Sequence, residues 1–290
     1  MRRYEIVYKS VNCPGCPKPI TALVVEPDRI DKNTGAMLFT HGWGCNRFYD
    51  VDKIEYSCDR FNLVCVSVEY RDCGYEFNPA TGAGYCRPYD TSFYQVFDVL
   101  NGLRTVLAIH RDLNRKRLFH YARSQGGHIA LIGSMFAPKT FAFMYLSSPI
   151  THLDKNILTW PGREFTPTEL SVRNMLEHAD RIQCPLFIDH GTGDTDVPHD
   201  IHTEELVRRL KALGRKPAVK YYPGGRHDLT PATTMYDAFK TMAAKPMKTM
   251  TNRMTDDFTA GSKVEITCAD KTLCIDWSEP TDSPGLFEWK

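Results

Sequence analysis

A serine lies between an arginine and a glutamine in the hexapeptide RSQGGH, residues 123–128. A serine hydroxyl is a weak nucleophile, and it attacks a carbonyl only where a base is within reach and N–H groups face the reacting oxygen. Ala122 and Gly126 stand two positions to either side of Ser124, and such small residues suit a tight turn from a strand into a helix. The alternative is a serine that only caps a helix predicted over 126–135, because serine is favoured at that position.

Acidic and histidine candidates follow Ser124 in the chain, each in a short segment rich in glycine. The segment HGTGDTDVP contains Asp194 and Asp196, and the segment GGRHDL contains His227. A histidine can take the serine proton as a general base, while a carboxylate can hold the imidazole in the correct tautomer. Acyl transfer through a covalent serine intermediate needs these three residue types. Both aspartates are also typical turn residues beside a glycine, so this pattern alone does not choose between them.

The elements that must position these groups are short apolar runs, typical of buried parallel strands, that alternate with helical segments. Such alternation predicts a parallel sheet with helices on both faces. Ser124, the two aspartates and His227 each come after a predicted strand, and functional groups gather at the carboxyl ends of parallel strands. The predicted antiparallel strands are 4–11 and 20–27; the buried strands are 36–42, 62–70, 117–123, 141–147, 185–191 and 218–224; the helices are 89–113, 126–135, 200–213 and 231–242.

Together with the segment HGWG at 41–44, these motifs resemble the α/β-hydrolase superfamily over residues 35–240. They are most similar to the branch that contains prolyl-oligopeptidase catalytic domains, dienelactone hydrolases and acetyl esterases. The pattern of the superfamily at the nucleophile is G-x-S-x-G, and Ala122 replaces its first glycine here. The resemblance implies an α/β-hydrolase fold, a mostly parallel central sheet with helices on both faces. N-terminal antiparallel strands and a C-terminal β-hairpin are expected in addition.

The resemblance also implies roles for the catalytic residues. Ser124 would be the nucleophile and His227 the base. Asp194 stands four residues after the histidine of the second HG pair, which is the place of the acid in the family, and Asp196 is the alternative. No metal and no organic cofactor is required for this reaction.

An oxyanion hole needs two backbone N–H donors. The resemblance assigns one to Gln125, the residue after the serine, and the other to Trp43, the residue after the first His-Gly pair. A simple turn is the alternative interpretation of HGWG. Trp43 would also place an indole beside the acyl group.

Two long segments, 71–89 and 151–178, are expected to cap the site, because long connections in a compact domain are commonly lids or pocket walls. Their aromatic residues can stack on a sugar or an aryl group, and their arginines can bind a carboxylate. Local packing is the alternative role for these side chains. The substrate contacts predicted in and beside these segments are Arg123, Tyr75, Arg87 and Trp160.

The sequence indicates the substrate less clearly than it indicates the reaction. Prolyl-oligopeptidase relatives usually carry a large extra domain that filters peptides, and a chain of 290 residues is not expected to hold one. This favours a short-chain acyl esterase or deacetylase that acts on a small-molecule ester, for instance an acylated sugar. A stand-alone peptidase or amidase is the alternative enzyme. A hydrolase-fold binding module that has lost its activity is the alternative of another class.

The composition excludes some classes of partner. With 36 basic and 35 acidic residues the formal net charge is +1, which argues against broad binding to nucleic acid or to an anionic membrane. No run approaches the roughly 20 apolar residues of a membrane span. The start MRRYEIVYKS has no apolar region of a signal peptide, so a cytoplasmic protein with reduced cysteines is expected. The pair CPGC at 13–16 remains open between a turn, a redox pair and half of a zinc site.

The chain divides into a hydrolase domain over 1–244 and an extension over 245–290. The extension contains SKVEITCADKTLCIDW, which reads as two alternating strands around a turn. Such a hairpin has an open edge, and an open edge often pairs with another chain. We therefore expect the extension either to mediate a homo-oligomer or to form a local flap.

Overall fold

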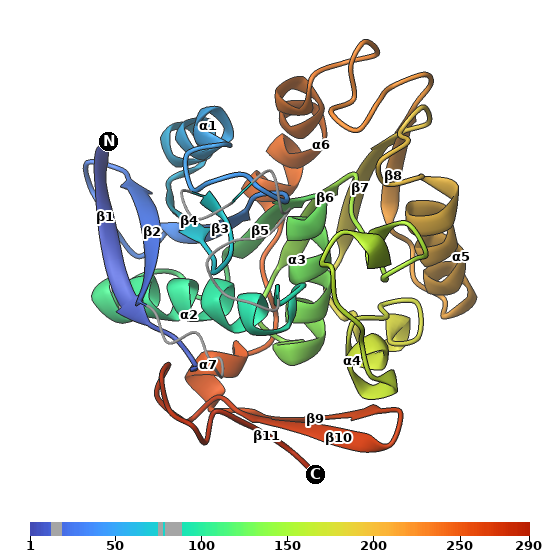
Figure 1. Cartoon of the computed structure of the whole chain (residues 1–290). Coiled ribbons are helices and arrows are strands. Elements are labelled where there is room, and N and C mark those ends of the chain that lie inside the picture. The colour runs from blue at the N-terminus through green and yellow to red at the C-terminus, as the bar shows by residue number, and fades with distance from the viewer. Residues whose placement is uncertain (13–18, 75–77, 79–88) are drawn as a thin grey trace.

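The central element of the protein is an eight-stranded sheet, seen in a computed structural model that describes residues 1–12, 19–74, 78 and 89–290 (Figure 1). The strand order is β1-β2-β4-β3-β5-β6-β7-β8. The strands from β4 to β8 in this order are parallel, whereas β1 and β2 are antiparallel at one edge. The predicted α/β-hydrolase fold is therefore confirmed. The strands are β1 (Arg2–Lys9), β2 (Pro19–Glu26), β3 (Gly35–Thr40), β4 (Leu63–Glu69), β5 (Leu118–Arg123), β6 (Phe143–Ser147), β7 (Leu186–Gly191) and β8 (Ala218–Tyr222).

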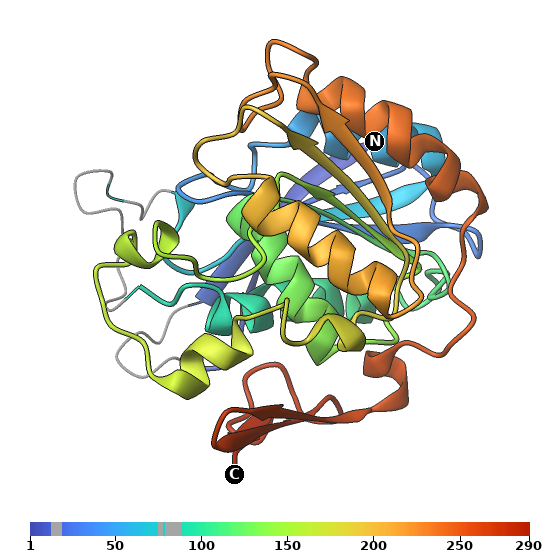
Figure 2. The ribbon, with the colours of Figure 1, turned by 90° about the vertical axis from the view of Figure 1, so that its right-hand side faces the viewer.

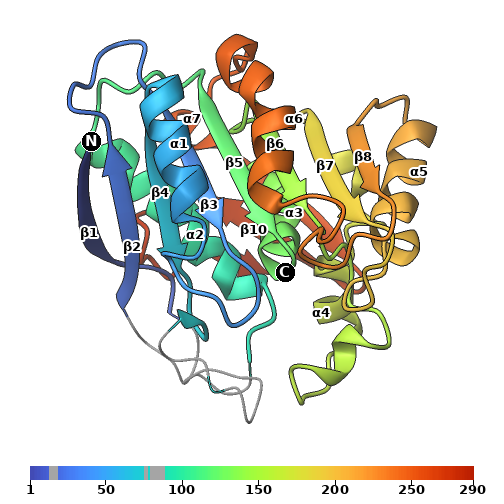
Figure 3. The same ribbon diagram turned by 90° about the horizontal axis from the view of Figure 1, so that it is seen from above.

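Two hydrophobic layers cover the two faces of this sheet. Successive side chains of a strand point to opposite faces, so Leu38 joins the core on one side while Met37 and Phe39 join the core on the other. Helices α2, α3 and α5 cover the face to which Leu38 points, and α1 and α6 cover the opposite face (Figure 3). The helices are α1 (Val51–Phe61), α2 (Phe93–Ile109), α3 (Gln125–Phe136), α4 (Pro167–Val172), α5 (Glu205–Ala212), α6 (Met235–Thr249) and α7 (Asp257–Ala260).

Several helices differ from the prediction. Helices α1, α4 and α7 were not predicted. Helix α6 begins four residues after the expected start at 231 and continues through Pro246 to Thr249. Helix α5 is preceded by a turn of π-helix, Asp200–Glu204, so the predicted helix over 200–213 consists of two parts. Within the described part of the chain, no helix is both long and apolar enough to cross a membrane.

The C-terminal extension forms a second, three-stranded antiparallel sheet in the order β11-β10-β9 (Figure 2). The predicted hairpin is confirmed as β9 (Lys263–Cys268) and β10 (Lys271–Asp276), joined by a turn in which Ala269 has φ 50°. The third strand, β11 (Phe287–Trp289), was not predicted. One face of this sheet shares the hydrophobic core of α2 and α3, and the buried Trp277 Nε1–H donates to the carbonyl of Phe136 at 2.8 Å.

Candidate active site

Ser124 lies in the sharp turn between β5 and α3, where the sequence pattern placed it. Its backbone has φ 53° and ψ −125°, a strained conformation for a residue with a side chain. A Cβ at Gly126 would collide with the carbonyl oxygens of Thr40 and His41, so only glycine fits at this position, two residues after the serine. The Ser124 side chain makes no capping hydrogen bond to α3, and the alternative role as a helix cap therefore lacks support.

His227 and Asp194 meet, although 33 residues separate them. The Nδ1 of His227 lies 2.7 Å from Oδ2 of Asp194. The Asp194 carboxylate is buried, while the His227 side chain is 19% exposed. The other oxygen of Asp194 accepts the backbone N–H groups of Asp196 and Val197, both at 3.0 Å. The contact selects Asp194 over Asp196 as the partner of the imidazole.

His190 also bonds to the Asp194 carboxylate, and the sequence analysis did not assign it this contact. Its Nε2 lies 3.1 Å from Oδ2 of Asp194 and 2.8 Å from the carbonyl of Val197. Both neighbours are acceptors, so Nε2 carries a proton, and Nδ1 lies 2.7 Å from the hydroxyl oxygen of Thr203. The only signal in the sequence was the position of His190, four residues before Asp194 at the end of β7.

Four donors therefore surround one carboxylate. Burial raises the pKa of Asp194, but the hydrogen bonds from His190 and His227 outweigh it and hold the pKa of this carboxyl well below its ordinary value. Asp194 stays ionised over the whole range in which a histidine titrates. An ionised partner orients the imidazole and stabilises the imidazolium that forms when the base takes a proton.

A pocket of about 420 Å³ is lined by both Ser124 and His227. Trp43 stacks on Tyr89 with ring centroids 4.3 Å apart and meets Trp160 edge to face at 5.4 Å, so two indoles narrow this pocket. The predicted contacts Trp160 and Arg123 both reach it. Tyr75 and Arg87, predicted with them, lie outside the described residues. The lining residues are Gly42, Trp43, Cys45, Arg123, Ser124, Trp160, Asp196 and His227.

The two residues expected to form the oxyanion hole, Trp43 and Gln125, directly follow Gly42 and Ser124, which lie close together at the carboxyl ends of β3 and β5. Strands β3 and β5 are neighbours, and a Cβ built on Gly42 would be 3.2 Å from Cβ of Ser124. Gln125 is the first residue of α3, and the N–H groups of a first helical turn have no partner within the helix. Its side chain accepts the hydroxyl of Tyr89 at 2.9 Å and donates to Gln95 at 3.0 Å, which fixes the start of the helix.

Residues 89–245 match the prolyl oligopeptidase family, a stretch that includes Ser124, Asp194 and His227 and leaves Trp43 outside. The chain belongs to this family. Its fold is that of the α/β-hydrolase superfamily, as the motifs predicted.

Solved structures agree with the family in fold. An acylaminoacyl peptidase in complex with Z-Gly-Gly-Phe-chloromethyl ketone aligns with a TM-score of 0.68 at 16% identity, over 85% of this chain and 42% of that one. A Pyrococcus horikoshii acylaminoacyl peptidase gives 0.68 at 14% identity, over 87% and 42%. A Mycobacterium tuberculosis puromycin-hydrolyzing peptidase gives 0.65 at 18% identity, over 84% and 39%. The chain thus spans less than half the length of these structures, and likeness at such identity shows the fold alone.

Asp194, Asp196 and His227 each offer a possible metal ligand, and these atoms lie within 4.8 Å of one another. The hydrogen bonds around Asp194 argue against a metal at that place. Both oxygens of Asp194 already accept two donors each, and a cation would have to displace His227 from Oδ2. The arrangement fits an acid that orients a base better than it fits a metal centre.

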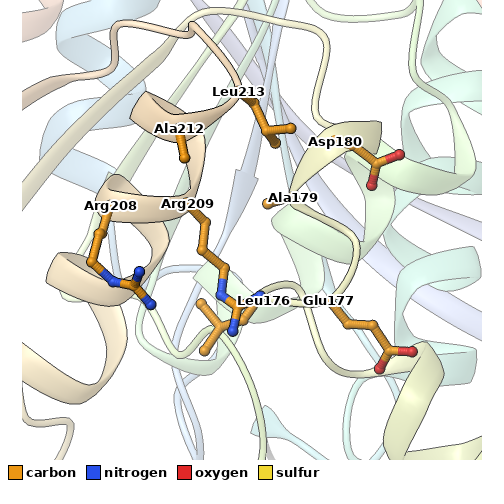
Figure 4. Close-up of a pocket in the computed structure, with 8 residues that line it drawn as sticks. All are labelled: Leu176, Glu177, Ala179, Asp180, Arg208, Arg209, Ala212 and Leu213. Carbon is orange, nitrogen blue, oxygen red and sulfur yellow. The ribbon is translucent and has the colours of Figure 1, made fainter.

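A second hollow, of about 480 Å³, lies between α5 and residues 176–180 and shares no lining residue with the first (Figure 4). Its basic side chains, Arg208 and Arg209, come from α5. Both donate to Glu205, at 2.6–2.9 Å and 3.0 Å. Their charges are therefore paired within the helix, and the hollow offers no nucleophile.

Proposed function

We propose that this serine hydrolase cleaves short-chain acyl esters by an acyl-enzyme mechanism, with Ser124, His227 and Asp194 as its catalytic triad. One observation carries the proposal: His227 Nδ1 contacts the buried Asp194 carboxylate at 2.7 Å, and His227 and Ser124 line the same pocket. With Nδ1 engaged, the Nε2 nitrogen is the one that serves the serine.

The proposed reaction has two halves. Ser124 Oγ attacks the carbonyl carbon and gives its proton to His227, while the backbone N–H groups of Trp43 and Gln125 bind the oxyanion. His227 then returns the proton to the alcohol oxygen as the ester bond breaks, which leaves the acyl group on Ser124. A water molecule, deprotonated by His227, attacks this acyl-enzyme, and the acid leaves as Ser124 regains its proton.

The aromatic wall of the pocket supports a small acyl group. Trp43 and Trp160 are bulky and stand edge to face on its wall, which leaves room for an acetyl or propionyl group more readily than for a long chain. Aromatic walls of this kind also suit an acylated sugar, whose ring can stack on an indole.

A peptidase or amidase is the second candidate. It is favoured by the family of the chain and by the solved structures, whose titles name peptidases. An amide has a poorer leaving group than an aryl ester, but the same three residues would act on it. The substrate therefore decides between the two candidates.

A fluorophosphonate probe followed by a substrate panel tests the proposal. We expect the probe to label Ser124, and acetyl and propionyl p-nitrophenyl esters to be cleaved faster than octanoyl esters and aminoacyl anilides. A preference for anilides would promote the peptidase. Absence of labelling in the folded protein would favour a binding module without activity.

A further inference from the structure

Arg123, the last residue of β5, lies directly before the nucleophile and lines the same pocket. It is only 6% exposed. Two of its guanidinium nitrogens, Nε and Nη1, are buried, and neither has a hydrogen-bond acceptor among the residues that the structure describes. The guanidinium lies over the ring of Tyr49, with its carbon 4.5 Å from the ring centroid. An aromatic face attracts the charge but leaves the N–H groups in the guanidinium plane without partners.

No acid in the described ranges neutralises this charge by direct contact. Asp50 is the acid that acts most strongly on the guanidinium; its Oδ1 pairs with Lys53 Nζ at 3.0 Å, and neither of its oxygens accepts a hydrogen bond from Arg123. Asp196 also lines the pocket, yet it accepts no hydrogen bond from Nε or Nη1 of Arg123. A buried cation without an acceptor is costly, and sites of this kind are usually completed by a ligand or by water.

The other two buried arginines of the described residues each donate to protein acceptors through at least two guanidinium nitrogens. Arg71 binds both oxygens of Asp98, with its Nε 2.7 Å from Oδ2. Arg173 donates to the carbonyls of Thr91, Asp90 and Glu169. Arg123 is the exception among the three, and its position beside Ser124 ties this exception to the active site.

We propose that Arg123 recognises a carboxylate on the substrate, so that the preferred ester carries an anionic group a few bonds from the scissile carbonyl. This inference rests on the proposed function, because it names the substrate class of the same pocket. A guanidinium presents parallel N–H groups that match the two oxygens of a carboxylate, and such pairs are stronger than neutral hydrogen bonds. The carboxylate can stand on the acyl side or on the alcohol side of the ester.

Two matched pairs of small esters separate these sides. Methyl hydrogen succinate and methyl succinamate place the carboxylate or its neutral amide on the acyl side. O-acetyl-lactate and O-acetyl-lactamide place the same two groups on the alcohol side. We expect wild-type kcat/KM, followed by proton NMR, to favour the carboxylate in one of the pairs by about ten- to a hundredfold, as a charged hydrogen bond allows.

The variants assign the preference to a residue. Arg123→Gln should abolish the preference for the carboxylate. Arg123→Lys should keep part of this preference, because an ammonium retains the charge but lacks the paired N–H groups of a guanidinium. Arg226→Gln is the matched control: Arg226 precedes His227 as Arg123 precedes Ser124, but its side chain is exposed and donates to Thr230. The control should keep the full preference. No preference in either pair, its survival in Arg123→Gln, or its equal loss in the control would overturn the inference.

A binding measurement keeps the inference independent of turnover. Succinamate should bind to the wild-type protein at least about tenfold more tightly than succinamide by calorimetry, and Arg123→Lys should reduce the difference. Equal binding of the two compounds would refute the role of Arg123 even if Arg123→Gln does not fold. Loss of probe labelling with succinamate binding retained would instead refute the proposed function and leave the anion site standing.

Discussion

Replacing Asp194 with asparagine tests the proposed triad most directly, because the structure shows what the amide would face. In the wild-type protein, Oδ1 accepts two backbone N–H groups, and Oδ2 accepts His190 and His227. An asparagine has one oxygen and one NH₂ group, so two of these four donors must face another donor. If the oxygen keeps the two backbone N–H groups, the NH₂ group points at His227 Nδ1 and forces that nitrogen to become an acceptor.

The consequence is a wrong tautomer of the base. His227 would then carry its proton on Nε2, and it could no longer take one from Ser124. In Ser-His-Asp enzymes this defect lowers kcat by about 10⁴-fold while the geometry stays intact. We expect a loss of that size for Asp194→Asn in the hydrolysis of p-nitrophenyl acetate, with an unchanged circular dichroism spectrum.

Asp196→Asn is the matched control, since Asp196 gives Asp194 only its backbone N–H group. Its kcat should fall by less than about tenfold, the scale of one lost hydrogen bond. A larger loss in Asp196→Asn than in Asp194→Asn would refute the assignment of the acid. Equal, mild losses in both variants would show that the imidazole needs no acid to orient it.

Three further outcomes are expected. Ser124→Ala should abolish fluorophosphonate labelling and lower kcat by about 10⁴-fold or more with the fold retained, and labelling that survives would exclude Ser124 as nucleophile. Trp43→Ala should narrow the ratio of acetyl to octanoyl ester cleavage, and the change in activation free energy should be at most about 1–3 kcal/mol for each methylene of the acyl chain. An unchanged ratio would mean that Trp43 does not line the acyl site. Trp277→Ala should lower the free energy of unfolding in urea by about 3–5 kcal/mol, and a loss below 1 kcal/mol would mean that the C-terminal sheet adds little to the core.

The parallel strands were predictable because they are buried on both faces and so form continuous apolar runs. The run over 36–42, for example, became β3, whose six residues are all buried. The placement of Ser124 after β5 and Asp194 after β7 followed from the same runs. A parallel sheet brings its carboxyl ends to one edge, so residues far apart in sequence meet there without any local signal between them.

Other elements depend on contacts that the sequence does not show. Helix α1 buries Ile54, Cys58 and Phe61 at helical spacing, but these few positions alternate with polar residues in VDKIEYSCDRF. Proline disfavours a helix interior, yet α6 continues through Pro246 because the residues around it pack against the core. The strand β11 has only three residues, and its pairing with β10 alone defines it.

The contact of His190 with the acid was equally hidden, because spacing cannot say which of ten histidines meets a carboxylate. The sequence places His190 at the end of β7, where it looks like a buried strand residue. Only the fold brings its Nε2 and the Nδ1 of His227 to the same oxygen of Asp194. Chain order therefore predicts the candidate reacting residues, while the groups that contact them emerge only from the structure.

The C-terminal sheet bears on the active site through α3. This helix begins at Gln125, directly after Ser124, and ends at Phe136. Its first turn is fixed by the side-chain bonds of Gln125 to Tyr89 and Gln95, and its last carbonyl accepts the indole N–H of Trp277. The extension thus buries the far end of the helix that carries the strained turn at Ser124, which gives residues 263–290 a structural role within one chain (Figure 1). Pairing of this sheet with a second chain stays a prediction, and it would have to use the edges or face that this packing leaves uncovered.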